Sequence, residues 1–221
     1  MSGAAPVHDT SSGVESGLVD GILNIDKPAD ITSMDVVRRV KRASGHKQRV
    51  GHGGTLDPIA TGVIPICLGQ ATRMMEYLIE STKEYRGLIE LGVETDTYDV
   101  LGKVTKKIDP SHVTLKDVES ALPSFKDDIQ QVPPMYSALK RQGKRLYELA
   151  RAGIYVERSP RGVKVLSIEI LDWSPPIVDL QITCGRGFYM RSLAHDLGRM
   201  LGCGGHMKTL VRLRSGPFHI S

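Results

Sequence analysis

Hydrophobic and polar positions change along the chain in short blocks, and the spacing within each block predicts one helix or strand. Runs of apolar, β-branched residues bounded by glycine or proline are typical of strands. The sequence has such runs at residues 21–25, 84–91, 162–173 and 177–184, and a further apolar run at residues 61–68. Ser174-Pro175-Pro176 separates two of these strands and predicts the turn between a neighbouring pair.

Apolar residues that recur at intervals of three and four predict helices. Helices are expected from Ser33 to near Gly45, over residues 70–81, from Leu115 to Pro123, over residues 144–152 and over residues 188–201. We expect Ser33 to cap the first helix, and Met74, Met75, Leu78 and Ile79 to face inward in the second. Because strands and helices mix without regular βαβ alternation, the pattern predicts an α+β fold with a mixed, mainly antiparallel sheet flanked by helices.

Length and composition are those of one soluble globular domain. The chain has 221 residues, of which 40% are hydrophobic and 24% charged. Residues 1–20 carry no basic start followed by an apolar run, so they do not have the pattern of a secretory signal peptide. We expect a disordered tail there and a single domain over residues 21–221. No stretch approaches the roughly 18 apolar residues of a membrane helix, and we expect a monomer without a membrane partner.

Cysteine and histidine usage argues against a metal site. Cys67, Cys184 and Cys203 are far apart, the seven histidines are dispersed, and neither set has zinc-ligand spacing. An odd number of unpaired cysteines suits a reducing compartment, so the sequence predicts a cytoplasmic protein without a metal.

Charge is distributed unevenly. The chain has 29 basic and 25 acidic residues, a net charge of +4. Residues 136–165 have an excess of six positive charges, and from Arg186 to Arg214 only Asp196 opposes the basic residues. Such clusters are expected for a polyanion partner, although a merely solubilising face is the competing interpretation.

Four segments contain the candidate chemistry. Residues 51–58 hold three glycines in four positions and then Asp57-Pro58, in a loop that matches neither the Walker nor the Gly-x-Gly-x-x-Gly phosphate motif. On its own, Asp57 is an ordinary turn former and His52 an ordinary loop residue. The other segments are Lys83-Glu84-Tyr85, the proline-rich stretch 133–140, and Gly187-Phe188-Tyr189-Met190-Arg191.

Taken together and in this order, the motifs resemble those of the TruB family of tRNA pseudouridine synthases. The resemblance extends from Gly21 to Phe218, and residues 51–58 are its most specific part. The other matching motifs are Asn24-Ile25-Asp26-Lys27-Pro28, Leu68-Gly69-Gln70-Ala71-Thr72, Lys83-Glu84-Tyr85, Thr95-Asp96-Thr97, Tyr136-Ser137-Ala138-Leu139-Lys140 and Gly187-Phe188-Tyr189-Met190-Arg191. The resemblance implies the pseudouridine synthase fold and isomerase chemistry that needs no cofactor.

The resemblance also implies the site residues. Asp57 would be the nucleophile, which suits an aspartate because its ordinary pKa of about 3.9 leaves it ionised at neutral pH; attack on the sugar C1′ and attack on the base both remain open. Arg191 would form an ion pair with Asp57. Tyr85 would stack under the base or take the C5 proton, and stacking is favoured because a tyrosine with its ordinary pKa near 10 is a poor base.

The implied substrate is tRNA, through the uridine at position 55 of its T-loop, which must be flipped out of the stack. Three matching residues would line the uridine pocket, namely His52, Tyr189 and Leu210. Lys27 would serve as a structural or RNA-side lysine. Lys140, Arg141 and Lys144 would contact phosphates of the T-arm stem-loop.

Two departures from the family pattern keep alternatives open. The chain has Leu210-Val211-Arg212 where relatives commonly read Leu-Arg-Arg, and it ends at Ser221, so we expect the C-terminal PUA-type module to be absent. The alternatives are a guide-RNA-dependent synthase acting on ribosomal RNA and a noncatalytic RNA-binding or RNA-folding protein. A glycoside or nucleoside hydrolase is disfavoured because only one carboxylate stands out.

Overall fold

The computed structural model of the protein describes residues 18–141 and 143–220. In chain order its elements are β1 (Gly21–Lys27), α1 (Ser33–Ala43), β2 (Val50–His52), β3 (Thr61–Leu68), the 3₁₀ helix η1 (Gly69–Met74), α2 (Met75–Glu80), β4 (Lys83–Leu91), β5 (Val93–Thr95), β6 (Val104–Lys107), α3 (Leu115–Ala121), the 3₁₀ helix η2 (Leu122–Phe125), β7 (Asp127–Gln131), β8 (Lys140–Arg141), β9 (Lys144–Arg145), α4 (Leu146–Arg151), β10 (Arg161–Ser174), β11 (Ile177–Cys184), α5 (Met190–Met200), β12 (Gly205–Ser215) and β13 (Phe218–His219). The predicted tail falls mostly on residues 1–17, which lie outside the described residues, while Val19 and Asp20 already contact the domain through Gln48 and Gln70.

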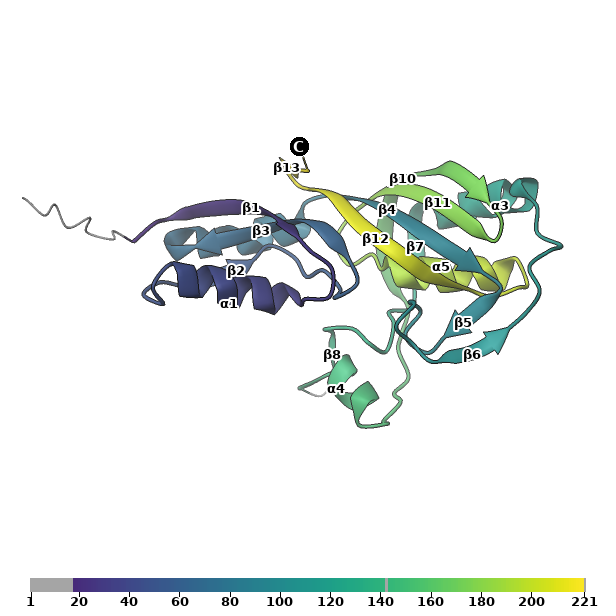
Figure 1. The fold of residues 1–221 in the computed structure, drawn as a ribbon, viewed down its shortest axis with the longest axis horizontal. Helices are drawn as coiled ribbons and strands as arrows, with labels where there is room; N and C mark the ends of the chain where they lie inside the picture. Colours follow the sequence, from purple (N-terminus) through teal and green to yellow (C-terminus); the bar gives the residue numbers. More distant parts are fainter. Residues whose placement is uncertain (1–17, 142, 221) are drawn as a thin grey trace, which may run out of the picture.

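One long sheet runs through the described part of the molecule (Figure 1). Its strand order is β1-β3-β12-β4-β11-β10-β7, with β2 added to β3 and β13 to β12. Neighbours are antiparallel except β3 and β12, which run parallel over a short stretch at Val211 and Arg212. The predicted α+β fold with a mixed, mainly antiparallel sheet is confirmed, and β10 and β11 form the predicted strand pair.

Helix α5 packs across the middle of this sheet. Leu193, Ala194 and Leu197 are fully buried and belong to the main hydrophobic core. Gly198 lets the helix approach the start of β12, because a Cβ there would collide with the backbone of Gly204. This close packing fixes the first turn of α5, where Arg191 lies, against the centre of the sheet.

Two predicted helices differ from the pattern. Residues 70–81 divide into η1 and α2, because the Thr72 hydroxyl donates to the Gly69 carbonyl oxygen at 2.7 Å and competes with an α-helical bond there. Leu78 is buried as expected, but Met74 is 46% exposed, so its predicted inward position is wrong. Residues 144–152 begin as the strand β9, because Lys144 pairs with Arg141 in a hairpin before α4 starts.

The first helix is capped by Thr32 rather than by Ser33. Thr32 and Asp35 form a reciprocal capping box, in which each side chain accepts from the other's backbone N–H. Ser33 is the first helical residue, and its hydroxyl is engaged elsewhere. Within residues 18–141 and 143–220, no helix has both the length and the apolar character needed to cross a membrane.

Candidate functional site

The glycine-rich loop between β2 and β3 is anchored to the domain on both sides of Asp57. The buried Ser33 hydroxyl accepts from the Leu56 N–H at 2.7 Å and donates to the Leu56 carbonyl at 2.9 Å. On the other side, the Pro58 carbonyl accepts from the Asp30 N–H at 2.9 Å. The backbone that carries Asp57 is therefore fixed by side chains and loops outside it.

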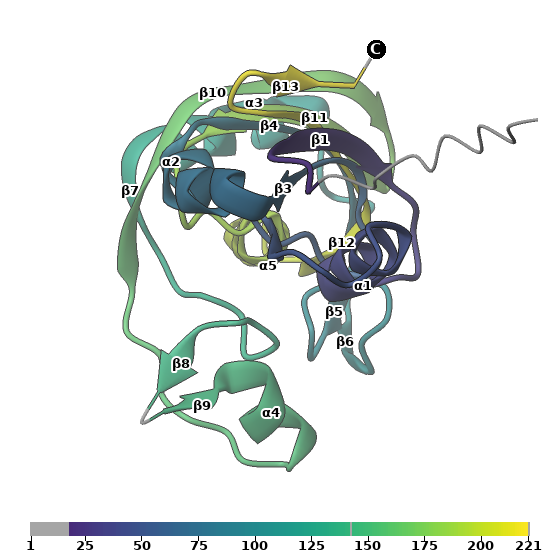
Figure 2. The ribbon, with the colours of Figure 1, turned by 90° about the vertical axis from the view of Figure 1, so that its left-hand side faces the viewer.

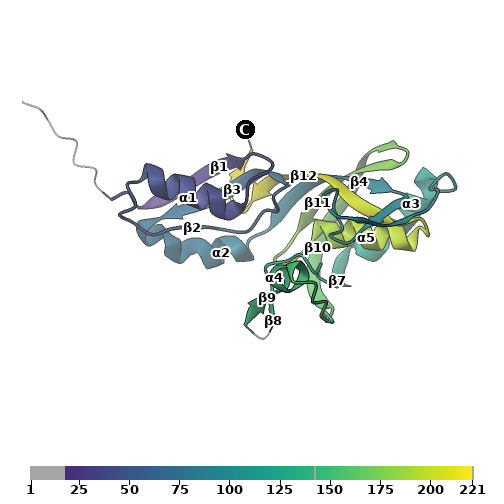
Figure 3. The ribbon, with the colours of Figure 1, turned by 60° about the horizontal axis from the view of Figure 1, so that its bottom comes forward.

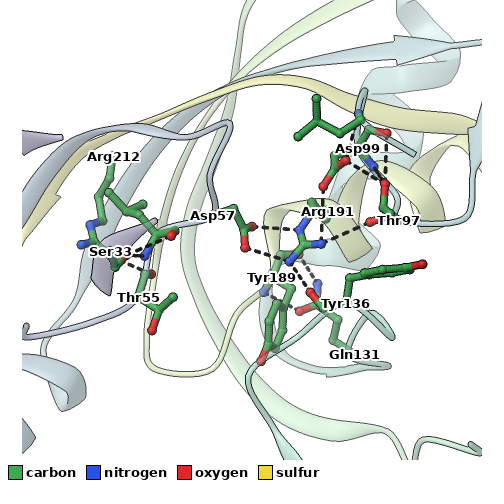
Figure 4. A network of polar contacts seen from close by, with 12 residues as sticks. Ser33, Thr55, Asp57, Thr97, Asp99, Gln131, Tyr136, Tyr189, Arg191 and Arg212 are labelled. Atoms are coloured by element: carbon green, nitrogen blue, oxygen red, sulfur yellow. Dashed lines mark hydrogen bonds and ion pairs between the residues drawn. The ribbon is translucent and has the colours of Figure 1, made fainter. Parts of the chain in front are cut away.

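Arg212 fastens the same loop from β12. Arg212 is 1% exposed, and its guanidinium donates to the carbonyl oxygens of Val63 at 2.6 Å, Gly54 at 3.1 Å and Thr55 at 3.3 Å. Figure 4 shows Arg212 with Ser33 and Thr55 on one side of Asp57 and Arg191 on the other. Gly62 permits this approach of β12, since a Cβ at its φ of +101° would collide with the Arg212 carbonyl oxygen.

Asp57 faces Arg191, which is 134 positions away in the sequence (Figure 4). Arg191 Nη2 donates to Asp57 Oδ1 at 2.9 Å, and Arg191 Nε lies 2.8 Å from Asp57 Oδ2. Only the Nη2 contact has hydrogen-bond geometry, so the Nε contact is chiefly one of charge. The Arg191 side chain is 4% exposed and that of Asp57 29%, so the carboxylate alone reaches the surface.

Arg191 is held by partners other than Asp57. It donates to the carbonyl oxygens of Tyr136 at 2.9 Å and Thr97 at 3.3 Å, and Nη1 lies 3.5 Å from the Asp99 carboxylate. Asp99 is itself buried and accepts from the Thr97 hydroxyl at 2.7 Å. The guanidinium is thus positioned by two separate segments, residues 97–99 and Tyr136, in addition to its ion pair with Asp57.

Tyr85 lies on β4 directly opposite Arg212 of β12. Burial raises the pKa of the Tyr85 hydroxyl, and the nearby Asp57 carboxylate adds to the increase although Arg212 opposes it. Such a phenol stays protonated at neutral pH and is a poor base. Leu210, two residues before Arg212, pairs with Gly87 of β4 and is buried in the main hydrophobic core.

Tyr189 and His52 lie around the same carboxylate and loop. The Tyr189 backbone is fixed by the Gln131 side chain, which accepts from its N–H at 2.7 Å and donates to its carbonyl at 3.0 Å. Burial raises the pKa of Tyr189, and the Asp57 charge also raises it. Burial, and then the charge of Arg212, lowers the pKa of His52, so its imidazole is neutral at neutral pH.

Lys27 is the predicted site residue that the structure removes furthest from solvent. It is fully buried, and its ammonium donates to the carbonyl oxygens of Pro28 at 2.8 Å, Ile31 at 2.9 Å and Pro58 at 3.2 Å. These contacts favour a structural role for Lys27, as a support behind the Asp57 loop, over its other predicted role as a lysine that faces the RNA.

Lys140, Arg141 and Lys144 are not brought to Asp57. They are exposed on the β8–β9 hairpin, in a segment of residues 137–160 that we call the arm. Figures 2 and 3 show β8, β9 and α4 projecting from the sheet. Tyr136, immediately before the arm, contacts Arg191 through its carbonyl, so the arm begins at the site even though its basic residues extend away from it.

The chain that carries this loop, tyrosine and arginine matches known family models over most of its length. Residues 41–190 match the TruB family pseudouridylate synthase N-terminal domain, and residues 191–221 match the tRNA pseudouridylate synthase B C-terminal domain. The chain belongs to the TruB family of tRNA pseudouridine synthases. The family assignment expected from the motifs is therefore confirmed, and both matched regions meet at Arg191.

Curated TruB relatives and solved structures agree with this assignment. The chain is 53% identical over 203 residues to tRNA pseudouridine synthase B of Dehalococcoides mccartyi, covering 92% of this chain and 67% of the relative. It is also 53% identical to the protein of that name from Symbiobacterium thermophilum, covering 90% and 68%. A chain in the crystal structure of a Cbf5-Nop10-Gar1 complex is 33% identical with a TM-score of 0.69, covering 91% of this chain and 50% of that one. The chain thus spans about two thirds of the curated relatives and half of the solved chain.

Two residues of this TruB site were missed by sequence reasoning, namely Asp99 and Arg212. Asp99 lies two positions beyond the Thr95-Asp96-Thr97 motif, and Arg212 stands beside Val211, where the sequence departs from the family pattern. Within the described ranges there is no group of three or more His, Cys, Asp or Glu residues that could hold a metal ion. The polar groups around Asp57 are instead guanidinium, phenol and backbone groups.

Proposed function

We propose that this TruB family member converts the uridine at position 55 of the tRNA T-loop into pseudouridine, with Asp57 as the nucleophile. The observation that carries the proposal is the ion pair between Asp57 and Arg191. It leaves one carboxylate partly exposed while its partner is buried. Curated relatives named tRNA pseudouridine synthase B support tRNA as the substrate class.

The reaction exchanges bonds within one nucleotide. The bond between ribose C1′ and uracil N1 breaks, the ring turns, and a bond between C1′ and C5 forms, after which C5 loses its proton and N1 gains one. Asp57 would form a transient covalent bond during this exchange, and it is regenerated at the end, so no oxidant or other reactant is consumed. Arg191 would keep the carboxylate charged and in one geometry once water is excluded.

Tyr85 and Leu210 would bind the flipped base. The raised pKa of Tyr85 supports a stacking role over proton removal at neutral pH. Leu210 offers an apolar contact on the neighbouring strand, and Tyr189 and the neutral His52 would line the rest of the pocket. Stacking and hydrogen bonds of this kind offset the few kcal/mol that flipping costs.

The arm would hold the T-arm outside the pocket. Lys140, Arg141 and Lys144 are exposed, and none of them has an ion-pair partner among the described residues. Unpaired exposed cations suit phosphate contacts, which give salt-dependent binding.

Release of tritium from a T-arm stem-loop carrying 5-tritiated uridine tests the proposal. The unmodified protein should release tritium without added metal, and Asp57→Asn should abolish release while binding the stem-loop nearly as well. Asp128→Asn, which changes an exposed carboxylate on β7, is the matched control and should remain active.

Each other outcome has a definite meaning. Turnover by Asp57→Asn would refute Asp57 as the nucleophile. Binding without turnover by the unmodified protein would favour the noncatalytic RNA-binding alternative. Turnover only with an added guide RNA would favour the guide-dependent alternative.

A further inference from the structure

The connection between β5 and β6 brings two oxygen atoms to Arg191. The Thr97 carbonyl oxygen accepts from Arg191 Nη1 at 3.3 Å, and the Asp99 carboxylate lies 3.5 Å from the same nitrogen. Figure 4 shows Thr97 and Asp99 beside the guanidinium, on the side away from Asp57. The residue between them is Tyr98, so the conformation of Tyr98 decides whether both oxygens reach Arg191.

Tyr98 has an unfavourable backbone conformation. Its φ is +63°, in the left-handed region that bulky side chains rarely adopt. Backbone bonds to β12 hold one side of this turn, since the Tyr98 carbonyl accepts from the Met207 N–H at 3.0 Å and the Val100 N–H donates to the Met207 carbonyl at 3.0 Å. Such a conformation persists only where the surroundings hold it, and it is often found near a functional site.

The Tyr98 ring lies flat on the imidazole of His195. The two ring centroids are 3.9 Å apart and the ring planes differ by 10°. His195 follows Arg191 by four positions in α5, so their side chains leave the same face of the helix one turn apart. The stack therefore joins the turn to the helix face that presents Arg191, through a contact that does not use the guanidinium.

At this contact His195 offers a flat ring. Its Nδ1 atom is buried and has no hydrogen-bond partner among the described residues. Burial lowers the pKa of His195, and the charge of Glu94 opposes this shift. The charges of Arg199 and Arg158 lower the pKa further, so the imidazole is neutral at neutral pH. A neutral aromatic ring is a good stacking partner for a phenol.

We propose that Tyr98 and His195 are positioning residues, whose stack holds the turn of residues 97–99 against α5 and thereby fixes the direction in which Arg191 meets Asp57. Neither ring would contact the RNA. The inference rests on the proposed function, because it takes the geometry of the Asp57 carboxylate to limit the rate. Without the stack the turn would remain bonded to β12, but its two oxygen atoms would move relative to Arg191.

The first test removes the phenol ring and keeps the backbone. Asn adopts a positive φ more readily than most residues, so Tyr98→Asn should keep the turn and lose the stack. At saturating RNA the single-turnover rate of tritium release should fall by about tenfold, with RNA affinity unchanged, because a small displacement of Arg191 is enough to slow the reaction. Tyr77→Asn, the same change at an exposed position of α2, is the matched control.

Conservative variants separate the ring from other features of the two side chains. Tyr98→Phe and His195→Phe each keep a ring that can stack, so both should recover most of the rate. A loss in Tyr98→Phe as large as that in Tyr98→Asn would overturn the proposal. Weaker RNA binding with an unchanged rate in Tyr98→Asn would also overturn it, because Tyr98 would then act on the RNA.

Double variants show whether the stack acts through Arg191. His195→Ala should slow the reaction about as much as Tyr98→Asn does, and combining the two should add little, because both remove the same contact. In an Arg191→Lys background the guanidinium is already gone, so adding Tyr98→Asn should slow the reaction further by less than about twofold. The full loss in that background would overturn the proposal.

A measurement without turnover completes the test. The exchange of the Arg191 guanidinium protons with solvent, followed by NMR, should be about tenfold faster in Tyr98→Asn than in Tyr98→Phe, because the turn opens more often. Equal exchange in the two variants would overturn the proposal. Thermal unfolding checks that Tyr98→Asn folds, and the pair His195→Ala and His195→Phe replaces it if it does not. Absence of tritium release from the unmodified protein would count against the proposed function, and the exchange rates would still decide this inference.

Discussion

The catalytic centre and the arm use the same kinds of charged side chain in opposite ways. At the centre, Arg191 and Arg212 are almost fully buried, and the guanidinium of each donates hydrogen bonds to several oxygen atoms with fixed positions. On the arm, Lys140, Arg141 and Lys144 are exposed and extend from a two-residue-per-strand hairpin. Around Asp57 each guanidinium is fixed by several directed bonds, whereas on the arm we expect only the number of positive charges to matter.

This difference predicts how each region responds to conservative change. A guanidinium that makes several directed hydrogen bonds cannot be replaced by an ammonium without losing some of them. Arginine has a planar group with N–H donors in several fixed directions, whereas lysine has one compact ammonium. Exposed cations that contact phosphates act as point charges and are interchangeable to a first approximation.

Arg191→Lys should have the largest effect. The lysine could still approach one Asp57 oxygen, but it could not also donate to the Tyr136 and Thr97 carbonyls. We expect the single-turnover rate at saturating RNA to fall by about a hundredfold or more, since a misplacement of about 1 Å can cost that much. Tritium release measures the rate, and Arg199→Lys, an exposed arginine on the same helix, is the control. A rate within threefold of the unmodified protein would show that Arg191 contributes charge alone.

Arg212→Gln should destabilise the whole Asp57 loop. The change leaves the Val63, Thr55 and Gly54 carbonyls without their charged donor, at a cost of about 3 kcal/mol in the free energy of unfolding. Urea unfolding measures the cost. Arg214→Gln in the same strand is the control, and because Arg214 pairs with Glu84 in a partly exposed position, it should cost no more than about 1 kcal/mol.

The effect of Arg212→Gln on the loop can also be measured through the pKa of His52. Burial lowers the pKa of His52, and the positive charge of Arg212 lowers it further. Removing that charge should raise the pKa of His52, which an NMR titration of its ring protons would detect. A pKa that does not change would mean that the loop has moved away from β12 in the variant.

The residues that sequence reasoning found are those whose motifs are local. Residues 51–58, Tyr85 and Arg191 each lie within a short recognisable run, and the order of these runs alone predicts the family that the family models show. The β10–β11 pair was equally predictable, since two β-branched runs flank one proline turn.

The residues that it missed depend on contacts between distant segments. Arg212 lies in β12, whose register with β4 shifts between Arg212 and Arg214, so strand alternation does not show which arginine is buried. Asp99 differs from Asp96 because Tyr98 adopts a positive φ of 63°, and this turns the chain so that Asp99 is buried beside Arg191. Neither feature is visible as a pattern along the sequence.

Substitutions on the arm should change RNA binding without changing folding stability, in contrast to those at Arg212. Lys140→Ala/Arg141→Ala/Lys144→Ala should weaken stem-loop binding by about tenfold and flatten its salt dependence, while folding stability stays within about 0.5 kcal/mol. Filter binding over a salt series gives both quantities. Replacing the three residues by Lys140→Arg/Arg141→Lys/Lys144→Arg should restore binding, because the charge is kept. A salt slope that does not change in the alanine variant would show that this cluster only increases solubility.

The smallest expected effect concerns Lys83, a second buried lysine behind the site. Its ammonium donates to the carbonyl oxygens of Leu78, Ile79 and Ser81, and burial lowers its pKa from 10.5 to about 8. Between these two values the unfolded chain binds more protons at this position than the folded chain, so folding stability should increase with pH there. We therefore expect the stability of the unmodified protein, relative to Lys83→Met, to rise by about 1 kcal/mol between pH 8 and pH 9.5.

Urea unfolding of both proteins at three pH values in this range measures that difference. The subtraction removes every other titrating group, so only the Lys83 contribution remains. A difference that is constant with pH would mean that the three carbonyl bonds compensate for burial and keep the ammonium charged. Such a result would extend to lysine what Arg191 and Arg212 show for arginine, namely that a buried cation can be retained when backbone oxygens surround it.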